Sequence, residues 1–295
     1  MFRTRLLSGI VLIIVAFGVI FAGGFVMAGA LCAISLIAFF ELTKATGVHT
    51  KGKKINGLEI AGIVLIIFYY ALLYVRMSLL TVNMVWHETA IAYDESLIYP
   101  VLTLSIVLFL IVFMLVYVFS FPKFKAGQVM SGFFELIYAP VLLSFLFIIR
   151  EGWQHGIYLV WLVFLCSWGS DTCAYCVGVL FGKHKMAPKL SPKKSIEGGI
   201  GGVVGAALLF GLYTYFVINP FSAEHIQMDL IGAMCLGAIG ALVSMIGDLA
   251  ASAIKRDYEI KDYGKLIPGH GGIMDRFDSV IIVAPIIFFG LVFIK

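Results

Sequence analysis

The sequence predicts an all-α, polytopic integral membrane protein with about nine transmembrane helices. Of its 295 residues, 61% are hydrophobic and only 13% are charged, and the mean hydropathy is +1.04. Ordinary soluble domains carry roughly 25% charged residues, so this composition lies outside the soluble class. The apolar residues also occur in runs of about 20, the length that crosses a bilayer, rather than in heptads or strand-like alternation.

The first apolar run extends from Leu6 to Phe40 without a charged residue, which is too long for one ordinary span. Gly23 and Gly24 near its middle predict a tight reversal of the chain. We therefore expect two helices, at 6–22 and 25–43. The length of the run argues against a cleaved signal peptide, because the apolar region of such a peptide has only about 7 to 15 residues.

The remaining apolar runs are separated by loops that contain most of the charged residues. They predict further helices at 57–75, 98–120, 129–149, 157–180, 198–218, 229–252 and 279–294. These segments follow one another too closely for a separate water-soluble unit. We expect one membrane-embedded domain over residues 1–295, with N-terminal helices in 1–150 and the motif-bearing catalytic portion in 151–295.

The basic residues are distributed unevenly between the two sets of loops. If the N-terminus is cytoplasmic, 18 of the 21 basic residues lie inside: Arg3, Arg5, Lys44, Lys51, Lys53, Lys54, Lys123, Lys125, Lys183, Lys185, Lys189, Lys193, Lys194, Lys255, Arg256, Lys261, Lys265 and Arg276. Arg76, Arg150 and Lys295 lie outside. Because Lys and Arg accumulate in cytoplasmic loops, this bias predicts a cytoplasmic N-terminus and supports nine spans. We therefore interpret the net charge of +4 primarily as an orientation signal.

The cysteines predict neither a disulfide framework nor a metal site. All of them lie in apolar runs, where a thiol packs as a small hydrophobic group. They are Cys32, Cys166, Cys173, Cys176 and Cys235.

Ionisable residues inside predicted spans are costly in hydrocarbon, and each is a functional candidate. Glu59 and Glu135 lie near predicted cytoplasmic helix ends, where we expect structural roles. Asp171 lies deeper in its span and must face a protein interior or a wet cavity. Tyr175, Gly178 and Gly182 follow it at helical spacing, so this face is either a helix-packing surface or part of a ligand site.

The loop at 182–199 contains five lysines, serine hydroxyls, and glycines at both ends. Such a loop suits a polyphosphate or an anionic lipid headgroup. It also fits a simpler role, since cytoplasmic lysines fix topology and attract acidic lipids. Proline and glycine predict a shaped loop in either case.

A second group of charged residues precedes the last span. Asp248, Ser252, Lys255 and Arg256 share one helix face, because they are spaced by four, seven and eight residues from Asp248. The segment 261–278 follows, with acids at Asp275 and Asp278. Carboxylates at 248, 275 and 278 are hard oxygen ligands suited to Mg²⁺, while basic side chains and glycine N–H groups suit phosphate. The pattern predicts a metal-assisted phosphate site, in which the role of His270 stays open.

Two motifs resemble a known family. Ser252-x-Ile254-Lys255-Arg256, then Lys261-Asp262, then Pro268-Gly269-His270-Gly271-Gly272-x-x-Asp275-Arg276-Phe277-Asp278 resembles the signature of the phosphatidate cytidylyltransferases, also called CDP-diacylglycerol synthases. The stretch from Asp171-Thr172-x-Ala174-Tyr175 through Ser191-Pro192-Lys193-Lys194-Ser195-x-Glu197-Gly198 is similar to the second block of this family, with Ser195 where threonine is usual. The motifs cover residues 171–278, and the N-terminal half agrees only in being hydrophobic and multi-spanning.

The resemblance implies transfer of CMP from CTP to phosphatidic acid with Mg²⁺, giving CDP-diacylglycerol and pyrophosphate. The residues expected to be catalytic are Asp248, Lys261, Asp262, His270, Asp275, Arg276 and Asp278. Those expected to bind nucleotide or phosphate are Ser252, Lys255, Arg256, Gly271, Gly272, Asp171, Lys193 and Lys194. As a hypothesis, Asp248, Asp275 and Asp278 hold the Mg²⁺, and a second cation stays open.

The expected partners are CTP, phosphatidic acid and the lipid bilayer, with no nucleic acid and with homo-oligomerisation left open. The expected location is a bacterial inner membrane, with the site facing the cytoplasm. Two alternatives stay open at this point. One is a CTP-dependent polyprenol or phytol kinase, and the other is an ion-coupled transporter with intramembrane carboxylates. The clustering of the acids near one membrane face argues against the transporter.

Overall fold

The computed structural model describes residues 2–49, 55–86, 98–153, 155–221, 228–269 and 271–294. Eight helical segments in these ranges are long and apolar enough to cross a membrane. They are Gly24–Thr46, Gly57–Leu79, Ile98–Phe119, Ala126–Gly152, Gly156–Phe181, Ile196–Ile218, Leu230–Asp257 and Met274–Ile294. This confirms the predicted all-α polytopic class.

Each of these segments overlaps one predicted span. The ninth predicted span, 6–22, is helix α1 (Phe2–Ala22), whose described apolar part, Ser8–Ala22, is shorter than the other eight. The structure therefore supports eight spans by length and leaves the ninth as a prediction. The last span begins at Met274 rather than at 279, so Asp275 and Asp278 lie inside its helix.

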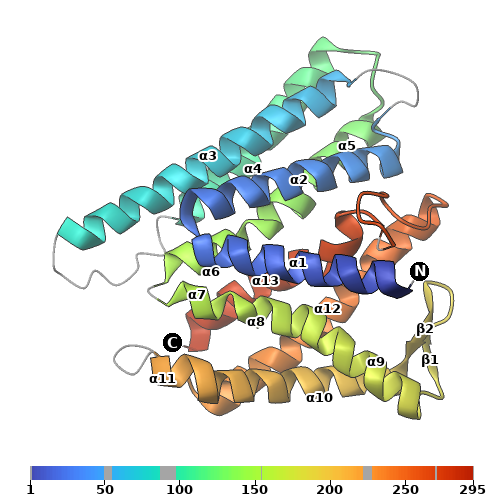
Figure 1. Ribbon diagram of the computed structural model, residues 1–295. Coiled ribbons are helices and arrows are strands. Elements are labelled where there is room, and N and C mark those ends of the chain that lie inside the picture. Colours follow the sequence, from blue (N-terminus) through green and yellow to red (C-terminus); the bar gives the residue numbers. More distant parts are fainter. Residues whose placement is uncertain are drawn as a thin grey trace. The chain divides into compact units, whose positions relative to one another are not determined.

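The chain divides into two compact units. Unit 1 comprises Met1–Trp153 and Asp262–Asp275, and unit 2 comprises Gln154–Lys261 and Arg276–Lys295. The helices of unit 1 are α1, α2 (Gly24–Thr46), α3 (Gly57–Trp86), α4 (Ile98–Phe119), α5 (Ala126–Leu136), the π-helical turn η2 (Ile137–Val141) and α6 (Phe145–Gly152) (Figure 1). Helix α2 packs against α3, α5 and η2, and α4 packs against α3 and α5.

The predicted reversal between the first two helices occurs at Gly23 and Gly24, whose φ angles are +60° and +44°. Two charged residues of α6 satisfy the helix ends at this point. Arg150 Nε donates to the carbonyl of Ile20 (2.9 Å), and the N–H of Gly24 donates to Glu151 Oε1 (2.8 Å). A cation thus lies at the C-terminal end of α1 and an anion at the N-terminal end of α2, as the helix dipoles favour.

The π-helical turn η2 contains Pro140, which has no N–H to donate to the helix ladder. Tyrosines of α3 supply polar contacts to this part of the chain. The hydroxyl of Tyr70 donates to the carbonyl of Pro140 (3.1 Å) and pairs with Ser35 (2.9 Å), and the hydroxyl of Tyr69 pairs with Ser144 (2.6 Å). All of these groups are buried, so the irregular turn is hydrogen-bonded within the protein.

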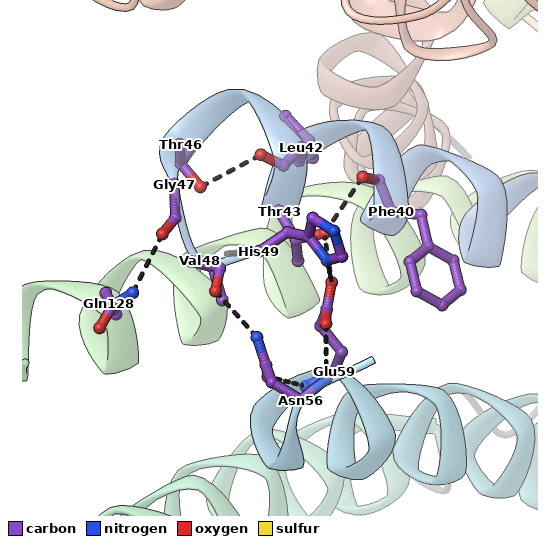
Figure 2. Close-up of polar contacts among 10 residues, drawn as sticks. All are labelled: Phe40, Leu42, Thr43, Thr46, Gly47, Val48, His49, Asn56, Glu59 and Gln128. Carbon is purple, nitrogen blue, oxygen red and sulfur yellow. Dashed lines mark hydrogen bonds and ion pairs between the residues drawn. The ribbon is translucent and has the colours of Figure 1, made fainter. Parts of the chain in front are cut away.

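Figure 2 shows the polar contacts that join the end of α2 to the start of α3. The Glu59 N–H donates to Asn56 Oδ1 (3.0 Å), and the Asn56 N–H donates to Glu59 Oε2 (2.8 Å), which is a reciprocal cap of α3. Glu59 Oε1 also pairs with His49 Nδ1 (2.8 Å). Glu135 accepts from Thr46 Oγ1 (2.6 Å). These contacts are of the structural kind expected for Glu59 and Glu135.

Unit 2 begins with a broken helix and continues through a hairpin into long helices. Its elements are α7 (Gly156–Leu159), α8 (Trp161–Phe164), η3 (Leu165–Gly169), α9 (Ser170–Phe181), β1 (Lys185–Ala187), β2 (Ser191–Ser195), α10 (Ile196–Tyr213), η4 (Thr214–Ile218), α11 (Asn219–Phe221), α12 (Leu230–Asp257) and α13 (Met274–Ile294), the last from Arg276 onward. Helix α10 packs against both α9 and α12.

Small residues let these helices approach closely. A Cβ atom at Gly198 would lie 2.8 Å from the carbonyl oxygen of Ala174 and 3.2 Å from the Cα of Gly178. A Cβ at Gly182 would lie 2.7 Å from the hydroxyl of Ser195. Gly178 and Gly182 therefore pack against the start of α10, as the helix-packing interpretation predicts.

The contact between α10 and α12 provides a test of this packing. A Cβ at Gly237 would lie 2.8 Å from the Cβ of Phe210 and 3.0 Å from the carbonyl oxygen of Ala206. We expect Gly237→Ala to destabilise the protein by about 1–3 kcal/mol, because the backbone must move to admit the methyl group. Thermal unfolding in detergent measures this. Gly29→Ala is the control, since nothing lies within 4 Å of a Cβ at Gly29, and equal melting temperatures for the two variants would contradict the prediction.

Candidate active site

A cluster of charged residues lies in unit 2, where α9, β2 and α12 come together. Lys194 Nζ forms an ion pair with Asp248 Oδ2. Asp171 interacts electrostatically with both of these residues. The structure thus brings together one residue from each of three separate parts of the motifs. The sequence predicted that Asp171, Lys193 and Lys194 bind nucleotide or phosphate, but it could not identify Asp248 as the partner of Lys194.

Asp278 belongs to the same cluster. Its side chain is buried, and its Oδ1 accepts the N–H of Ser279 (2.8 Å). The charges of Asp248, Lys255 and Arg276 act on it. A Cβ at Gly247 would lie 3.2 Å from the carbonyl oxygen of Asp278, so α12 meets α13 directly beside Asp248. Two carboxylates that act on each other in a partly buried place favour a bound cation.

Arg276 supplies positive charge to this cluster. Its charge acts on both Asp171 and Asp278. Among the described residues, its buried Nε atom has no hydrogen-bond partner. A buried guanidinium N–H without a partner is available to a phosphate or carboxylate oxygen of a ligand.

Several predicted binding residues of unit 2 lie at the surface. Lys193, Arg256 and Lys261 have exposed side chains, and Ser252 is half-buried. Their predicted contacts with nucleotide or lipid phosphate remain predictions.

The lysine-rich loop forms an antiparallel hairpin, β1–β2, in which Lys185 pairs with Ser195. The sequence predicted a shaped loop here, but not strands. Glu197 holds the base of the hairpin by accepting the N–H groups of Lys183 (3.1 Å) and His184 (3.2 Å), and it pairs with His184 Nδ1 (2.6 Å). The Ser195 hydroxyl caps α10 by accepting the N–H of Gly198 (3.2 Å), a role that serine and threonine share.

The other part of the motif lies in unit 1, in the loop before α13. Asp275 is buried, and its Oδ2 accepts the N–H groups of Tyr263 (2.9 Å) and Gly272 (3.0 Å). Ile267 and Gly271 form a bridge, in which the Ile267 N–H donates to the Gly271 carbonyl (2.8 Å). Asp275 therefore ties both ends of this loop to the first turn of α13.

Two glycines of this loop are needed for its backbone shape. Gly269 and Gly271 have φ angles of +78° and +87°, which side chains rarely adopt. The N–H of Gly272 is engaged by Asp275. Phosphate binding by Gly271 and Gly272 remains a prediction, Asp262 is exposed at the start of the loop, and His270 lies outside the described residues.

Glu41 of α2 is a residue that the sequence reasoning missed. It is buried, and it accepts the N–H groups of Ile273 (3.1 Å) and Met274 (2.8 Å) at the start of α13. The rule that marked Asp171 also applies to Glu41, because both are acids in predicted spans.

The predicted metal ligands fall in different units, with Asp275 in unit 1 and Asp248 and Asp278 in unit 2. In the part of the chain that the structure describes, no group of three or more His, Cys, Asp or Glu residues is arranged to hold a metal ion. The three-carboxylate metal site therefore remains a prediction.

The fold and the charged cluster define a class of protein: a polytopic membrane protein with an acidic and basic site suited to phosphate chemistry. Residues 3–294 match the cytidylyltransferase family, so the chain belongs to this family. This confirms the resemblance drawn from the motifs and extends it over the N-terminal half. Membership in this family does not favour the lipid kinase or transporter alternatives.

Three relatives are named phosphatidate cytidylyltransferase. The Bacillus subtilis protein is 31% identical over 290 residues, which cover 97% of this chain and 96% of the relative. The Haemophilus influenzae protein is 35% identical over 180 residues, covering 58% of this chain and 62% of the relative. The Synechocystis protein is 38% identical over 148 residues, covering 48% of each chain. The last two matches thus span less than two thirds of those relatives.

The anchoring of the hairpin by Glu197 can be tested by proteolysis. We expect Glu197→Ala to increase the rate of tryptic cleavage at the exposed Lys185 and Lys189 several-fold, because the hairpin base loses its carboxylate acceptor. His184→Ala is the matched control, since it removes the ring contact but keeps both backbone contacts. We expect a smaller change for this control. Unchanged cleavage of the Glu197→Ala hairpin would contradict the role of Glu197.

Proposed function

We propose that this protein transfers CMP from CTP to phosphatidic acid, giving CDP-diacylglycerol and pyrophosphate. The family match and the names of the relatives support the reaction. The observation that carries the proposal for this chain is the cluster of Asp171, Lys194, Asp248 and Asp278. Asp171, Asp248 and Asp278 lie in helices long and apolar enough to cross a membrane, where charged groups are costly and a functional role is favoured.

In the proposed reaction, an oxygen of the lipid phosphate forms a bond to the α-phosphorus of CTP. The bond from the α-phosphorus to the oxygen that bridges to the β-phosphorus breaks, and pyrophosphate leaves. Two polyanions must approach each other for this step, so their repulsion has to be screened. Lys194, Lys255 and Arg276 are the basic residues that this chain offers in the charged cluster.

Asp248 and Asp278 are the residues that would hold Mg²⁺. Their carboxylate oxygens are the hard ligands that this ion prefers, and the charge of Asp248 acts on Asp278. When bound, the ion supplies positive charge that stabilises the phosphates and the departing pyrophosphate. We assign Asp275 to holding the loop before α13, because its Oδ2 already accepts two backbone N–H groups.

A site within the membrane suits a diacyl substrate. The acyl chains of phosphatidic acid can stay in hydrocarbon while the phosphate moves laterally to the polar cluster. CTP is water-soluble and reaches the cluster from the cytoplasm. We therefore infer a bacterial inner membrane as the location, with the site and the basic β1–β2 hairpin on the cytoplasmic face.

Turnover by the purified protein in detergent tests the reaction. We expect wild type to form lipid-linked CMP and pyrophosphate from labelled CTP, phosphatidic acid and Mg²⁺. We expect Asp248→Asn to lower kcat by at least about 100-fold, because asparagine is a weaker ligand for the Mg²⁺ that would stabilise the charge of the transition state.

The control is Asp229→Asn at the other end of α12. Asp229 caps this helix by accepting the N–H of Gly232 (2.8 Å), and asparagine caps equally well. This variant should keep wild-type turnover. Formation of CDP and a phosphorylated lipid by wild type would indicate a kinase instead, and folded wild-type protein without any CTP turnover would contradict the proposal.

The proposed orientation is tested by labelling single introduced cysteines in intact cells. We expect Asp94→Cys, in the loop predicted to lie outside, to react with a membrane-impermeant maleimide. We expect Lys189→Cys, in the exposed part of the hairpin, to react only after the cells are opened. The unaltered protein, with its own five cysteines, is the control for background labelling. The reverse pattern would overturn the orientation.

A further inference from the structure

Glu41 lies in α2, far in sequence from both motifs, yet it contacts the loop before α13. Its two carboxylate oxygens accept the N–H groups of two successive residues, Ile273 to Oε1 (3.1 Å) and Met274 to Oε2 (2.8 Å). Its side chain is only 8% exposed. A buried carboxylate that accepts two backbone donors at a helix start forms strong, directional hydrogen bonds.

Helix α13 has no capping side chain of its own at this position. The residues before Met274 are Gly271, Gly272 and Ile273, none of which carries a polar side chain. The first N–H groups of a helix have no partner inside the helix, and leaving them unsatisfied in a buried place is costly. Glu41 therefore provides the cap that the local sequence lacks.

Two glycines of the loop pack directly against Glu41. A Cβ at Gly264 would lie 2.7 Å from Glu41 Cδ, and a Cβ at Gly272 would lie 2.6 Å from the same atom. Neither glycine has a positive φ angle. The absence of a side chain at these two positions is thus required by the closeness of Glu41 rather than by backbone conformation.

Glu41 and Asp275 together engage three consecutive backbone donors. Asp275 accepts the N–H of Gly272, and Glu41 accepts those of Ile273 and Met274. Asp275 also accepts the N–H of Tyr263, near the other end of the loop. The two carboxylates define where the loop ends and where α13 begins.

We propose that Glu41 is a positioning residue for the proposed CMP transfer, because it caps α13 and holds the loop at 262–273 against the first turn of this helix. The inference rests on the proposed function for its effect on catalysis. The first turns of α13 carry Asp275, Arg276 and Asp278, so a shift in the start of the helix moves these residues. A displacement of about 1 Å in such groups lowers turnover by about 100-fold.

The main experiment compares wild type with Glu41→Gln, which keeps the shape of the side chain and one acceptor oxygen. We expect kcat for formation of CDP-diacylglycerol to fall by about 10- to 100-fold, while the KM for CTP changes by less than about threefold. We also expect faster amide hydrogen exchange in peptides that cover 262–275, with no change elsewhere.

The matched control is Glu135→Gln. Glu135 is another buried glutamate of unit 1, and its hydrogen bond is to Thr46 rather than to the loop. This variant should keep the wild-type kcat and the wild-type exchange at 262–275. It separates the loss of a particular contact from the general effect of neutralising a buried acid.

A double-mutant cycle tests the contact between Glu41 and Gly264. Gly264→Ala places a methyl group against Glu41 and should lower kcat and the melting temperature, whereas Gly29→Ala should not. In a Glu41→Ala background the nearest clash is gone and only the Cα of Gly272, at 3.1 Å, remains close to the added methyl group, so Gly264→Ala should cost less than it does in wild type. Additive effects of the two substitutions would show that the glycine does not act through Glu41.

The proposal fails if Glu41→Gln keeps the wild-type kcat, or if exchange increases equally throughout the protein, which would indicate a general loss of stability. If wild type makes no CDP-diacylglycerol, that result contradicts the proposed function without testing the role of Glu41. Hydrogen exchange and the melting temperatures of the cycle then decide whether Glu41 holds the loop, so the two failures are distinguishable.

Discussion

The arrangement of this protein depends on one physical requirement: a backbone donor or acceptor released inside a membrane protein must find a partner in the protein itself. Two places illustrate it. Arg150 and Glu151 satisfy the carbonyl of Ile20 and the N–H of Gly24 at the reversal between α1 and α2, and Glu41 accepts the N–H groups at the start of α13. In each case the partner comes from a distant part of the chain. The breaks in the helices are therefore stabilised by tertiary contacts rather than by local capping, and the break before α13 is the one that shapes the motif.

The glycines of this chain serve different purposes, although they look alike in the sequence. Gly269 and Gly271 provide backbone angles, Gly198 and Gly247 let helices approach, and Gly264 and Gly272 make room for a carboxylate. A glycine-rich segment beside basic residues suggests a phosphate cradle. In the loop before α13, the packing of Glu41 and Asp275 accounts for a large part of the glycine content. These two carboxylates also compete with any ligand for the same backbone donors.

The spans could be predicted because hydropathy is a local property, and the reversal at Gly23–Gly24 followed from the length of one uncharged run. It could also be predicted that Asp248 and Asp278 belong to one site, because acids in apolar segments are costly and are therefore functional candidates. The β1–β2 hairpin could not be predicted, because its strands are short, β2 contains a proline, and its base depends on the anchoring contacts of Glu197. Glu41 was missed because its significance lies in contacts with residues more than 200 positions away, which no local pattern records.

The charges of the cluster support the proposal of an added cation. Among the described residues that interact in it, the acids Asp171, Asp248 and Asp278 are matched by Lys194, Lys255 and Arg276. The cluster is thus close to neutral before substrates bind. The phosphates of CTP and phosphatidic acid add several negative charges to this cluster, in which Asp278 is buried and the Lys194–Asp248 pair is about a quarter exposed. The basic residues cannot neutralise these phosphates while they remain paired with the acids, so a divalent ion on Asp248 and Asp278 would both replace Lys194 as the partner of Asp248 and free its ammonium group for a phosphate.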